Sequence, residues 1–435
     1  MSVPPLATNV DDAYRVCNPE QPLKADDTRY VDLTEVRGMK NFADTITKRI
    51  IRTAPAFHKQ LITGHRGCGK STEILRLKQK LERKNFFAIY IDVEEILDLG
   101  EVDYLDVLLA IARQTEQSIR EHDLQMDAAL LQGIYDWFAE KIITKEKKHD
   151  VNTKMEAKAS AGLKIPLVGE LFSSLTGDIQ SGSSQREVTR ENLERQQAEF
   201  FEYLNALIHE ARRLLKDERG FEDIVILVDG LEKMQYRLLS DEQSTHAVLF
   251  VHHAEQLKAP DCHIVYTVPV SLAFQANLGA AFPEGVMLMP MVKYMKPEGE
   301  QALMEIIQRR VDVGQVFETE DLLKRLVHIS GGAVRDLMRL MRLATEGGEQ
   351  IGQMDVQQAV NTVVREYDRL VRNKDIETLR FVQETKRVPA DEEYARLLNH
   401  RLILEYQNGE RWADLHPALL EISWIQDELN IQGEK

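Results

Sequence analysis

The stretch LITGHRGCGKSTEIL, residues Leu61 to Leu75, limits what this chain can fold into more than any other part of the sequence. It matches the pattern G-x-x-x-x-G-K-[ST] after a short apolar run, KQLITG, and apolar residues at helical spacing follow it. Glycines in such a turn let backbone N–H groups surround phosphate oxygens, and the helix N-terminus adds partial positive charge. The stretch therefore predicts a strand, a helix and between them a phosphate-binding loop made of Gly64, His65, Arg66, Gly67, Cys68, Gly69, Lys70, Ser71 and Thr72.

The residue types in this phosphate loop indicate ATP and Mg²⁺ as cofactors. Lys70 can neutralise the β- and γ-phosphates, and the Ser71 hydroxyl can ligate the metal ion. A glycine-rich turn could also arise by chance. A chance turn would not be expected to lie between a predicted strand and a predicted helix, as this one does. Cys68 is expected to be a small filler rather than a redox switch.

A second acidic site is predicted in IVILVDGLEKM. A phosphate loop needs a carboxylate at the end of a neighbouring strand to hold Mg²⁺, and Asp229 directly follows an apolar run. We therefore expect Ser71 and Asp229 to be the metal ligands. Many ATPases carry a water-activating Glu next, whereas this chain has Gly230 and places its acid at Glu232. Glu232 is either the general base or a first-turn acid that favours the helix dipole, and in the second case hydrolysis is slow.

Several polar residues elsewhere could complete a site of this kind. Thr267 ends the apolar run HIVYTVP and could bind the attacking water or the γ-phosphate. Arg335 lies in the first turn after Gly331 and Gly332 and could fold back onto the γ-phosphate. Arg309 and Arg310 end a predicted helix, and one of them could reach a neighbouring subunit's nucleotide as an arginine finger. The alternative for Arg335 is a solvated helix residue, and the alternative for Arg309 and Arg310 is pairing with the dipole at the helix C-terminus.

Apolar runs alternating with helical patterns predict an α/β fold around a parallel sheet. The 435 residues suggest an N-terminal extension (1–55), an ATPase core (56–295), a helical lid domain (296–375) and a C-terminal winged-helix module (376–435). The net charge of −16 argues against a protein that coats nucleic acid. Three scattered cysteines exclude a disulfide framework. With no signal peptide or apolar span expected, a soluble cytoplasmic protein without a membrane partner is predicted.

Residues 145–190 differ in composition from the rest of the core and are rich in Lys, Gly and Ser. We expect a flexible insertion rather than a core element. It could contact nucleic acid, an acidic partner or a neighbouring subunit, or be a solvated loop. Its basic residues are Lys145, Lys147, Lys148, Lys154, Lys158 and Lys164.

Four features stand in order along residues 55–350: GHRGCGKST, VILVDGLEK, IVYTVP and SGGAVRDLMRL. Together they resemble an AAA+-type P-loop ATPase of the STAND and origin-recognition-complex-like branches. The DGLE form resembles STAND proteins, since standard AAA+ enzymes carry Asp-Glu. The resemblance implies a nucleotide-binding α/β domain, a helical lid bearing Arg335, and homo-oligomers with the nucleotide near a subunit interface. Bacterial relatives of this type often serve in defence systems.

The C-terminal stretch resembles a winged helix. LILEY and ERWADL flank an Asn-Gly turn, which is a strong hairpin signal. The second predicted helix begins with Asp391, Glu392 and Glu393, which would repel phosphates. The pattern therefore favours a protein-contacting or lid-type module over a DNA reader, with Trp412 as a packing residue.

The sequence as a whole favours a slow, Mg²⁺-dependent ATPase whose nucleotide state controls oligomerisation or a partner protein. An initiator-type loader or remodelling ATPase that binds DNA is the alternative. A small-molecule kinase is the third hypothesis, and the long helical tail argues against it.

Overall fold

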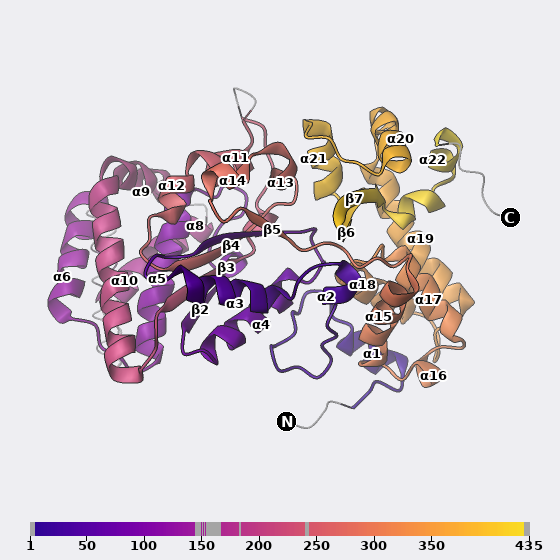
Figure 1. The fold of residues 1–435 in the computed structure, drawn as a ribbon, viewed down its shortest axis with the longest axis horizontal. Coiled ribbons are helices and arrows are strands. Elements are labelled where there is room, and N and C mark those ends of the chain that lie inside the picture. Colours follow the sequence, from indigo (N-terminus) through magenta and orange to yellow (C-terminus); the bar gives the residue numbers. More distant parts are fainter. Residues whose placement is uncertain are drawn as a thin grey trace.

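The computed structural model describes residues 5–143, 149, 151, 153, 167–181, 184–239 and 243–429. Its centre is a five-stranded sheet with the strand order β2-β3-β4-β1-β5 (Figure 1). All neighbouring strands in it run parallel, which confirms the predicted α/β fold. The strands are β1 (Lys59–Thr63), β2 (Phe87–Asp92), β3 (Ile224–Asp229), β4 (His263–Val268) and β5 (Val286–Leu288).

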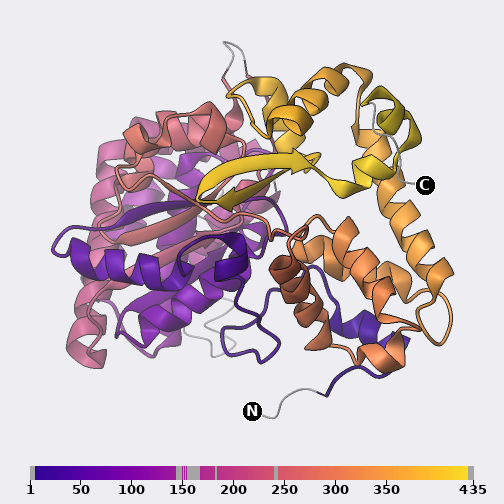
Figure 2. The same cartoon turned by 45° about the vertical axis from the view of Figure 1, so that its right-hand side comes forward.

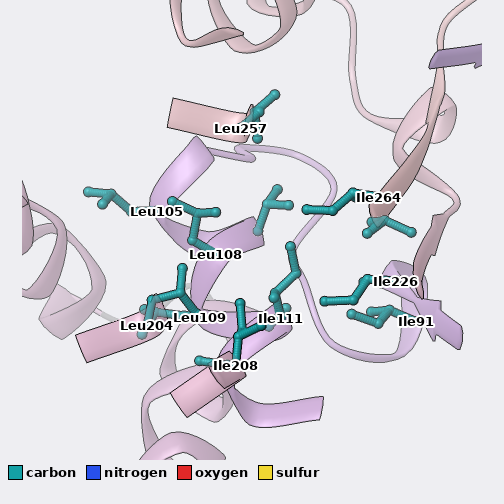
Figure 3. Packing of buried hydrophobic residues seen from close by; sticks show 14 of the residues in the cluster. Ile91, Leu105, Leu108, Leu109, Ile111, Leu204, Ile208, Ile226, Leu257 and Ile264 are labelled. Atoms are coloured by element: carbon teal, nitrogen blue, oxygen red, sulfur yellow. The ribbon is translucent and has the colours of Figure 1, made fainter. Parts of the chain in front are cut away.

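Helices cover both faces of the sheet, which explains the unbroken apolar runs of its central strands. Alternate residues of β3 enter different cores: Ile226 and Val228 face one, Val225 and Leu227 the other. The first core is built with α5 (Tyr104–Glu121) and α10 (Gln197–Arg219), and Figure 3 shows Leu105, Leu108, Leu204 and Ile208 packed toward Ile91, Ile226 and Ile264. The second is built with α3 (Phe42–Thr53) and α4 (Lys70–Glu82).

The prediction of a flexible insertion over 145–190 is wrong for its described C-terminal part. Helices α8 (Leu167–Ser181) and α9 (Ser184–Arg195) lie there, and Leu171, Phe172 and Leu175 are buried in the first core. These residues follow a helical period that the surrounding Gly and Ser obscured. The six lysines fall outside the described residues.

Residues 297–370 form a helical body (Figure 1), and its hydrophobic core is continuous with apolar residues of the C-terminal module. It contains α15 (Pro297–Gln308), α16 (Val313–Val316), α17 (Glu320–Ile329), α18 (Val334–Ala344) and α19 (Gln353–Leu370). The N-terminal helix α1 (Val10–Val16) belongs to this core through Ala13, far from its neighbours in sequence. The segment from α1 to α2 (Thr34–Arg37) therefore runs along the helical body to the phosphate loop, where Arg37 donates to the Cys68 carbonyl.

The C-terminal module contains the predicted hairpin. Strands β6 (Ile403–Asn408) and β7 (Glu410–Leu415) pair in antiparallel fashion around Gly409, whose φ is +80°. Trp412 stacks on Tyr406 with ring centroids 4.6 Å apart. Figure 2 shows the hairpin above the junction between the sheet and the helical body. The module also contains α20 (Ile376–Thr385), α21 (Glu392–Asn399), η6 (Pro417–Glu421) and α22 (Ser423–Glu428).

Shorter elements connect these parts: η1 (Val93–Glu95), α6 (Ala128–Trp137), η2 (Phe138–Ile142), η3 (Leu231–Lys233), α11 (Thr245–Ala247), η4 (Val248–His252), α12 (Ala254–Lys258), α13 (Leu272–Gln275), α14 (Leu278–Ala281) and η5 (Asn373–Asp375). Within the described ranges, every helix is too short or too polar to cross a bilayer.

Candidate functional site

The phosphate loop connects β1 to the N-terminus of α4, as the sequence predicts. Its conformation requires glycine at two positions in particular. Gly69, the residue before α4, has a φ of +102°. A Cβ on Gly64, whose φ is +156°, would lie 2.5 Å from the Met289 carbonyl oxygen. The loop is therefore held tightly against the segment that follows β5.

Lys70 is buried, and its ammonium group is fully engaged inside the site. Its Nζ donates to the carbonyl oxygens of Gly64 (2.8 Å) and His65 (3.1 Å) and lies 3.1 Å from Glu232 Oε1. Burial alone would lower the pKa of Lys70, but the Glu232 carboxylate raises it above its ordinary value. A carboxylate thus lies beside the cation that the sequence assigns to phosphates.

Asp229 ends β3 and is buried beside the phosphate loop. Its Oδ2 accepts a hydrogen bond of 2.9 Å from the Tyr90 hydroxyl, whereas Oδ1 has no hydrogen-bond partner among the described residues. Burial and the nearby charge of Glu232 raise the pKa of Asp229 to about 6, against the lowering effect of the Ser71 and Tyr90 hydroxyls. A buried, unpartnered carboxylate oxygen next to a hydroxyl fits the oxygen ligands that Mg²⁺ prefers.

The turn after Asp229 explains how Glu232 enters the site. Gly230 has a φ of +99°, and its N–H donates to Thr267 Oγ1 at 2.9 Å. The chain then turns into η3 and places the Glu232 carboxylate against Lys70. Burial would raise the pKa of Glu232, but Lys70 and the Thr267 hydroxyl lower it. Glu232 thus lies in the first turn of η3, with its side chain buried inside the site.

Arg335 lies where the helical body contacts the phosphate loop. Its backbone N–H donates to the Gly67 carbonyl at 3.1 Å, and a Cβ on Gly67 would lie 2.7 Å from the Arg335 Cβ. The guanidinium donates to the Pro19 carbonyl at 3.2 Å and to Glu20 Oε2 at 3.1 Å. The cation predicted to bind phosphate is thus held by the N-terminal extension.

Arg309 and Arg310 lie at the end of α15, where the N-terminal extension of the same chain contacts them. Arg309 pairs with Glu305 and donates to the Tyr30 carbonyl. Arg310 is only 6% exposed and donates to the Ile306 carbonyl at 2.6 Å. Burial lowers its pKa to about 10. Both guanidinium groups are engaged within their own chain, because the N-terminal extension packs over the end of α15.

The N-terminal extension forms a wall of the cavity at the phosphate loop, which the sequence did not indicate. We call residues Asn18–Leu23 the strap, and they line this cavity together with Arg66, Lys70, Ser71, Glu232 and Arg335. The strap is attached to α4 by a hydrogen bond of 3.2 Å from the Leu23 N–H to Thr72 Oγ1. The composition of residues 1–55 carries no signal for this contact, since polar, proline-containing segments are commonly exposed.

The C-terminal hairpin contacts the phosphate loop directly. His65 is buried, and its Nε2 accepts a hydrogen bond of 2.9 Å from the backbone N–H of Glu405 in β6. Burial, with the positive charge of Lys70, lowers the pKa of His65 to about 3. Leu404 and Tyr406 belong to the same core as Cys68 and the helix that follows the loop. The phosphate loop is thus packed between the sheet and the C-terminal module.

No family model and no curated protein matches the sequence. Among solved structures, the chain is similar to Cdc6p from Pyrobaculum aerophilum, with a TM-score of 0.42 at 12% identity, covering 97% of this chain and 98% of that one. The chain is also similar to a Walker-type ATPase of Pyrococcus abyssi, with a TM-score of 0.39 at 14% identity. That match covers 96% of this chain and 100% of the other. A third similar structure is a RuvB mutant of Thermotoga maritima, with a TM-score of 0.37 at 12% identity. That match covers 93% of this chain and 96% of the other. Similarities this distant leave the function to be argued from the chain's own residues.

Proposed function

We propose that the protein is an AAA+-type P-loop ATPase that binds ATP with Mg²⁺ and hydrolyses it slowly. The observation that carries this proposal is the cluster of Lys70, Glu232 and Asp229 at the start of α4. A buried lysine, a buried acid beside it and a second acid at a strand end are the groups that phosphoryl transfer to water requires. Arg335 adds a fourth charged group from the helical body.

In this proposal, each residue has a role set by its position. Backbone N–H groups of the phosphate loop and the Lys70 ammonium bind the phosphates, and Ser71 and Asp229 hold Mg²⁺. When bound, the metal ion neutralises charge on the phosphate oxygens. Glu232 accepts the proton of the attacking water, and Thr267 fixes the Glu232 side chain by way of its hydroxyl. Arg335 binds the γ-phosphate once it leaves Glu20.

Slow hydrolysis follows from the pairing between Lys70 and Glu232. The same carboxylate that would accept a proton lies 3.1 Å from the lysine Nζ. Lys70 lowers the pKa of Glu232, and a weaker base is a poorer proton acceptor. Phosphates must draw Lys70 away before Glu232 can act, and this reorganisation favours a nucleotide-controlled switch over a fast motor.

The contact between His65 and Glu405 supports a regulatory output through the C-terminal module. We propose that nucleotide state controls oligomerisation or the binding of a partner protein, with the helical lid domain and the winged-helix module as the moving parts. The resemblance of the DGLE motif to STAND proteins supports a cytoplasmic role in bacterial antiviral defence. A DNA-binding initiator or loader remains the alternative, and the packing of β6 against the phosphate loop argues against a wing free to enter a groove.

Two substitutions test the enzymatic part of this proposal. Lys70→Ala should weaken ATP binding at least ~10-fold by calorimetry, because charge-assisted contacts of about 1.5–3 kcal/mol are lost. Glu232→Gln should keep ATP binding and lower turnover by ~100-fold or more, as expected for a general base. Lys78→Ala on the exposed side of α4 and Glu94→Gln at the cavity edge are matched controls. Unchanged ATP affinity or unchanged turnover in the respective variant would contradict the assignment.

The regulatory part is tested with the same Glu232→Gln protein, which should accumulate in the ATP-bound state. Mass photometry should show larger particles with ATP than with ADP or without nucleotide. A monomer under all three conditions would rule out control of oligomerisation. Stimulation of wild-type turnover by duplex DNA would favour the DNA-binding alternative, with an affinity that falls steeply with salt.

A further inference from the structure

Tyr90 is a polar residue next to Asp229 that no motif explains. It lies in β2, where Tyr90 pairs in register with Leu227 and Asp92 with Asp229. Successive side chains of a strand point to opposite faces, and Ala88, Val225 and Leu227 all enter the core on the α4 side. Tyr90 is two residues after Ala88, and Asp229 is two residues after Leu227. Both side chains therefore lie on the face of the sheet that carries the phosphate loop.

The diagonal spacing of these two residues suits a tyrosine. Residues offset by two positions on neighbouring strands lie diagonally across one face of the sheet, within reach of a long aromatic side chain. The Tyr90 hydroxyl covers this distance and donates to Asp229 Oδ2 at 2.9 Å. Its ring packs against the apolar core of α3 and α4 at the same time. A hydroxyl that could have pointed to solvent is thus directed at the carboxylate.

The two oxygens of Asp229 differ because of this hydrogen bond. Oδ2 has a donor, while Oδ1 is buried without a hydrogen-bond partner in the described part of the chain. A carboxylate that accepts one fixed hydrogen bond cannot rotate freely about its Cβ–Cγ bond. Outer groups of this kind orient ligating side chains, and removing them weakens metal binding by about 10–100-fold in known sites.

We propose that Tyr90 is a positioning residue that fixes the Asp229 carboxylate so that Oδ1 is presented to the divalent cation. This inference rests on the proposed function, in which Ser71 and Asp229 hold Mg²⁺. Tyr90 itself is not a ligand, since its hydroxyl is committed to Oδ2. The role is separate from packing, because the ring fills the core and the hydroxyl alone contacts the carboxylate.

The test is Tyr90→Phe, which keeps the ring and removes the hydroxyl. Mn²⁺ serves as the probe, and electron paramagnetic resonance measures its binding to the full chain in the presence of ADP. We expect the Mn²⁺ dissociation constant to rise about 10-fold in the variant. Affinity for ADP in the presence of EDTA should stay within about 2-fold of wild type, because the phosphate loop is untouched.

Tyr104→Phe is the matched control. Its hydroxyl accepts a hydrogen bond of 2.7 Å from Gln197 Nε2, and the residue does not line the cavity. It should reproduce any general loss of stability without changing Mn²⁺ affinity. An equal loss of Mn²⁺ affinity in both variants would assign the effect to stability and overturn the inference.

The remaining outcomes separate the inference from the function it rests on. Nucleotide-dependent Mn²⁺ binding that is equally tight in wild type and Tyr90→Phe would overturn the role of Tyr90 alone. Wild-type protein that binds Mn²⁺ no better with ADP than without it would overturn the metal site, and the inference with it. Asp229→Asn provides the reference for loss of the ligand itself.

Discussion

At the scale of single residues, Gly230 explains why the second acid is Glu232. A Cβ at this position would lie 3.0 Å from Val93 Cγ2 and 3.5 Å from Asp92 Oδ1. The backbone also has a φ of +99°, which disfavours any other residue. The turn therefore has no room for an acid directly after Asp229. Glu232 reaches the same region from the following turn.

We predict that Gly230→Ala lowers the free energy of unfolding by about 1–2 kcal/mol, from the left-handed backbone and the contact with Val93. Gly230→Glu should not raise ATP turnover, because its side chain would start from a strained turn. Urea unfolding and a phosphate-release assay measure the two effects. Gly285→Ala is the control, since Gly285 has a φ of +66° but no atoms within 4 Å of an added Cβ. Equal stability of the two alanine variants would show that the contact with Val93 costs nothing, and faster turnover in Gly230→Glu would show that an acid at this position can act.

The sequence predicted the position of the phosphate-loop residues and Asp229 because each belongs to a local pattern: a strand, a glycine turn and a helix. It left the position of Glu232 open, because nothing local shows which way a side chain turns after a glycine with positive φ. It missed Tyr90 for a different reason. The role of Tyr90 depends on which strand lies beside β3. The residues of β2 and β3 do not by themselves indicate that the two strands are neighbours.

At the scale of elements, the strap connects the helical body with the phosphate loop. Glu20 on the strap pairs with Arg335 on α18, while Leu23 is hydrogen-bonded to Thr72 on α4. The Glu20 carboxylate is thus paired with the Arg335 guanidinium, the group that we propose binds the γ-phosphate. Phosphate and carboxylate are both anions and compete for the same guanidinium. If Arg335 binds the γ-phosphate as we propose, the strap opposes nucleotide binding at this end of the site.

Glu20→Gln should accordingly tighten ATP binding. The Glu20 side chain is 69% exposed, so its ion pair is a weak one of at most about 1 kcal/mol, and the gain should be at most ~5-fold. Calorimetry at low salt measures it, and the gain should shrink as salt screens the pair. Asp12→Asn removes the exposed pair with Arg15 on α1 and should leave affinity unchanged. Weaker ATP binding by Glu20→Gln would mean that Glu20 assists the nucleotide instead.

Prediction of elements succeeded where apolar spacing was clear and failed where composition obscured it. The strands β1, β3 and β4 and the C-terminal hairpin lie where the sequence places them. Helix α8 was missed, although Leu171, Phe172 and Leu175 repeat at helical spacing, because Gly and Ser residues around them indicated a loop. The strap was missed because a segment without regular structure has no period to detect, and only its contacts give it a role.

At the scale of the whole molecule, a buried ion pair joins the helical body to the C-terminal module. Arg401 precedes β6, and its guanidinium lies 2.6 Å from Asp336 in α18. Burial alone would raise the pKa of Asp336, but Arg401 and His416 hold it well below its ordinary range. Asp336 follows Arg335 directly, so this pair also fixes the start of the helix that contacts the phosphate loop. Loosening the C-terminal module should therefore change the contact between Arg335 and the phosphate loop.

Asp336→Asn should lower the free energy of unfolding by about 3 kcal/mol at pH 7, because it leaves the largely buried Arg401 without its charge partner. Asp336 has a lower pKa in the folded than in the unfolded protein. Its contribution is therefore fully present above the unfolded pKa of about 3.9 and is lost progressively as the pH falls from there toward the folded pKa. The difference in the free energy of unfolding between Asp336→Asn and wild type should accordingly be smaller at pH 3.5 than at pH 7, as measured by urea titration.

Glu421→Gln is the matched control, because Glu421 pairs with Arg325 across the same junction at 2.7 Å but with both side chains partly exposed. It should change the free energy of unfolding by less than about 1 kcal/mol at either pH. If the two variants were equally stable, the Asp336–Arg401 pair would not be what holds the C-terminal module to α18. A large loss in Asp336→Asn together with weaker ATP binding would instead link the module to the phosphate loop by way of Arg335. That link is the physical route by which a bound nucleotide could change what the C-terminal module contacts.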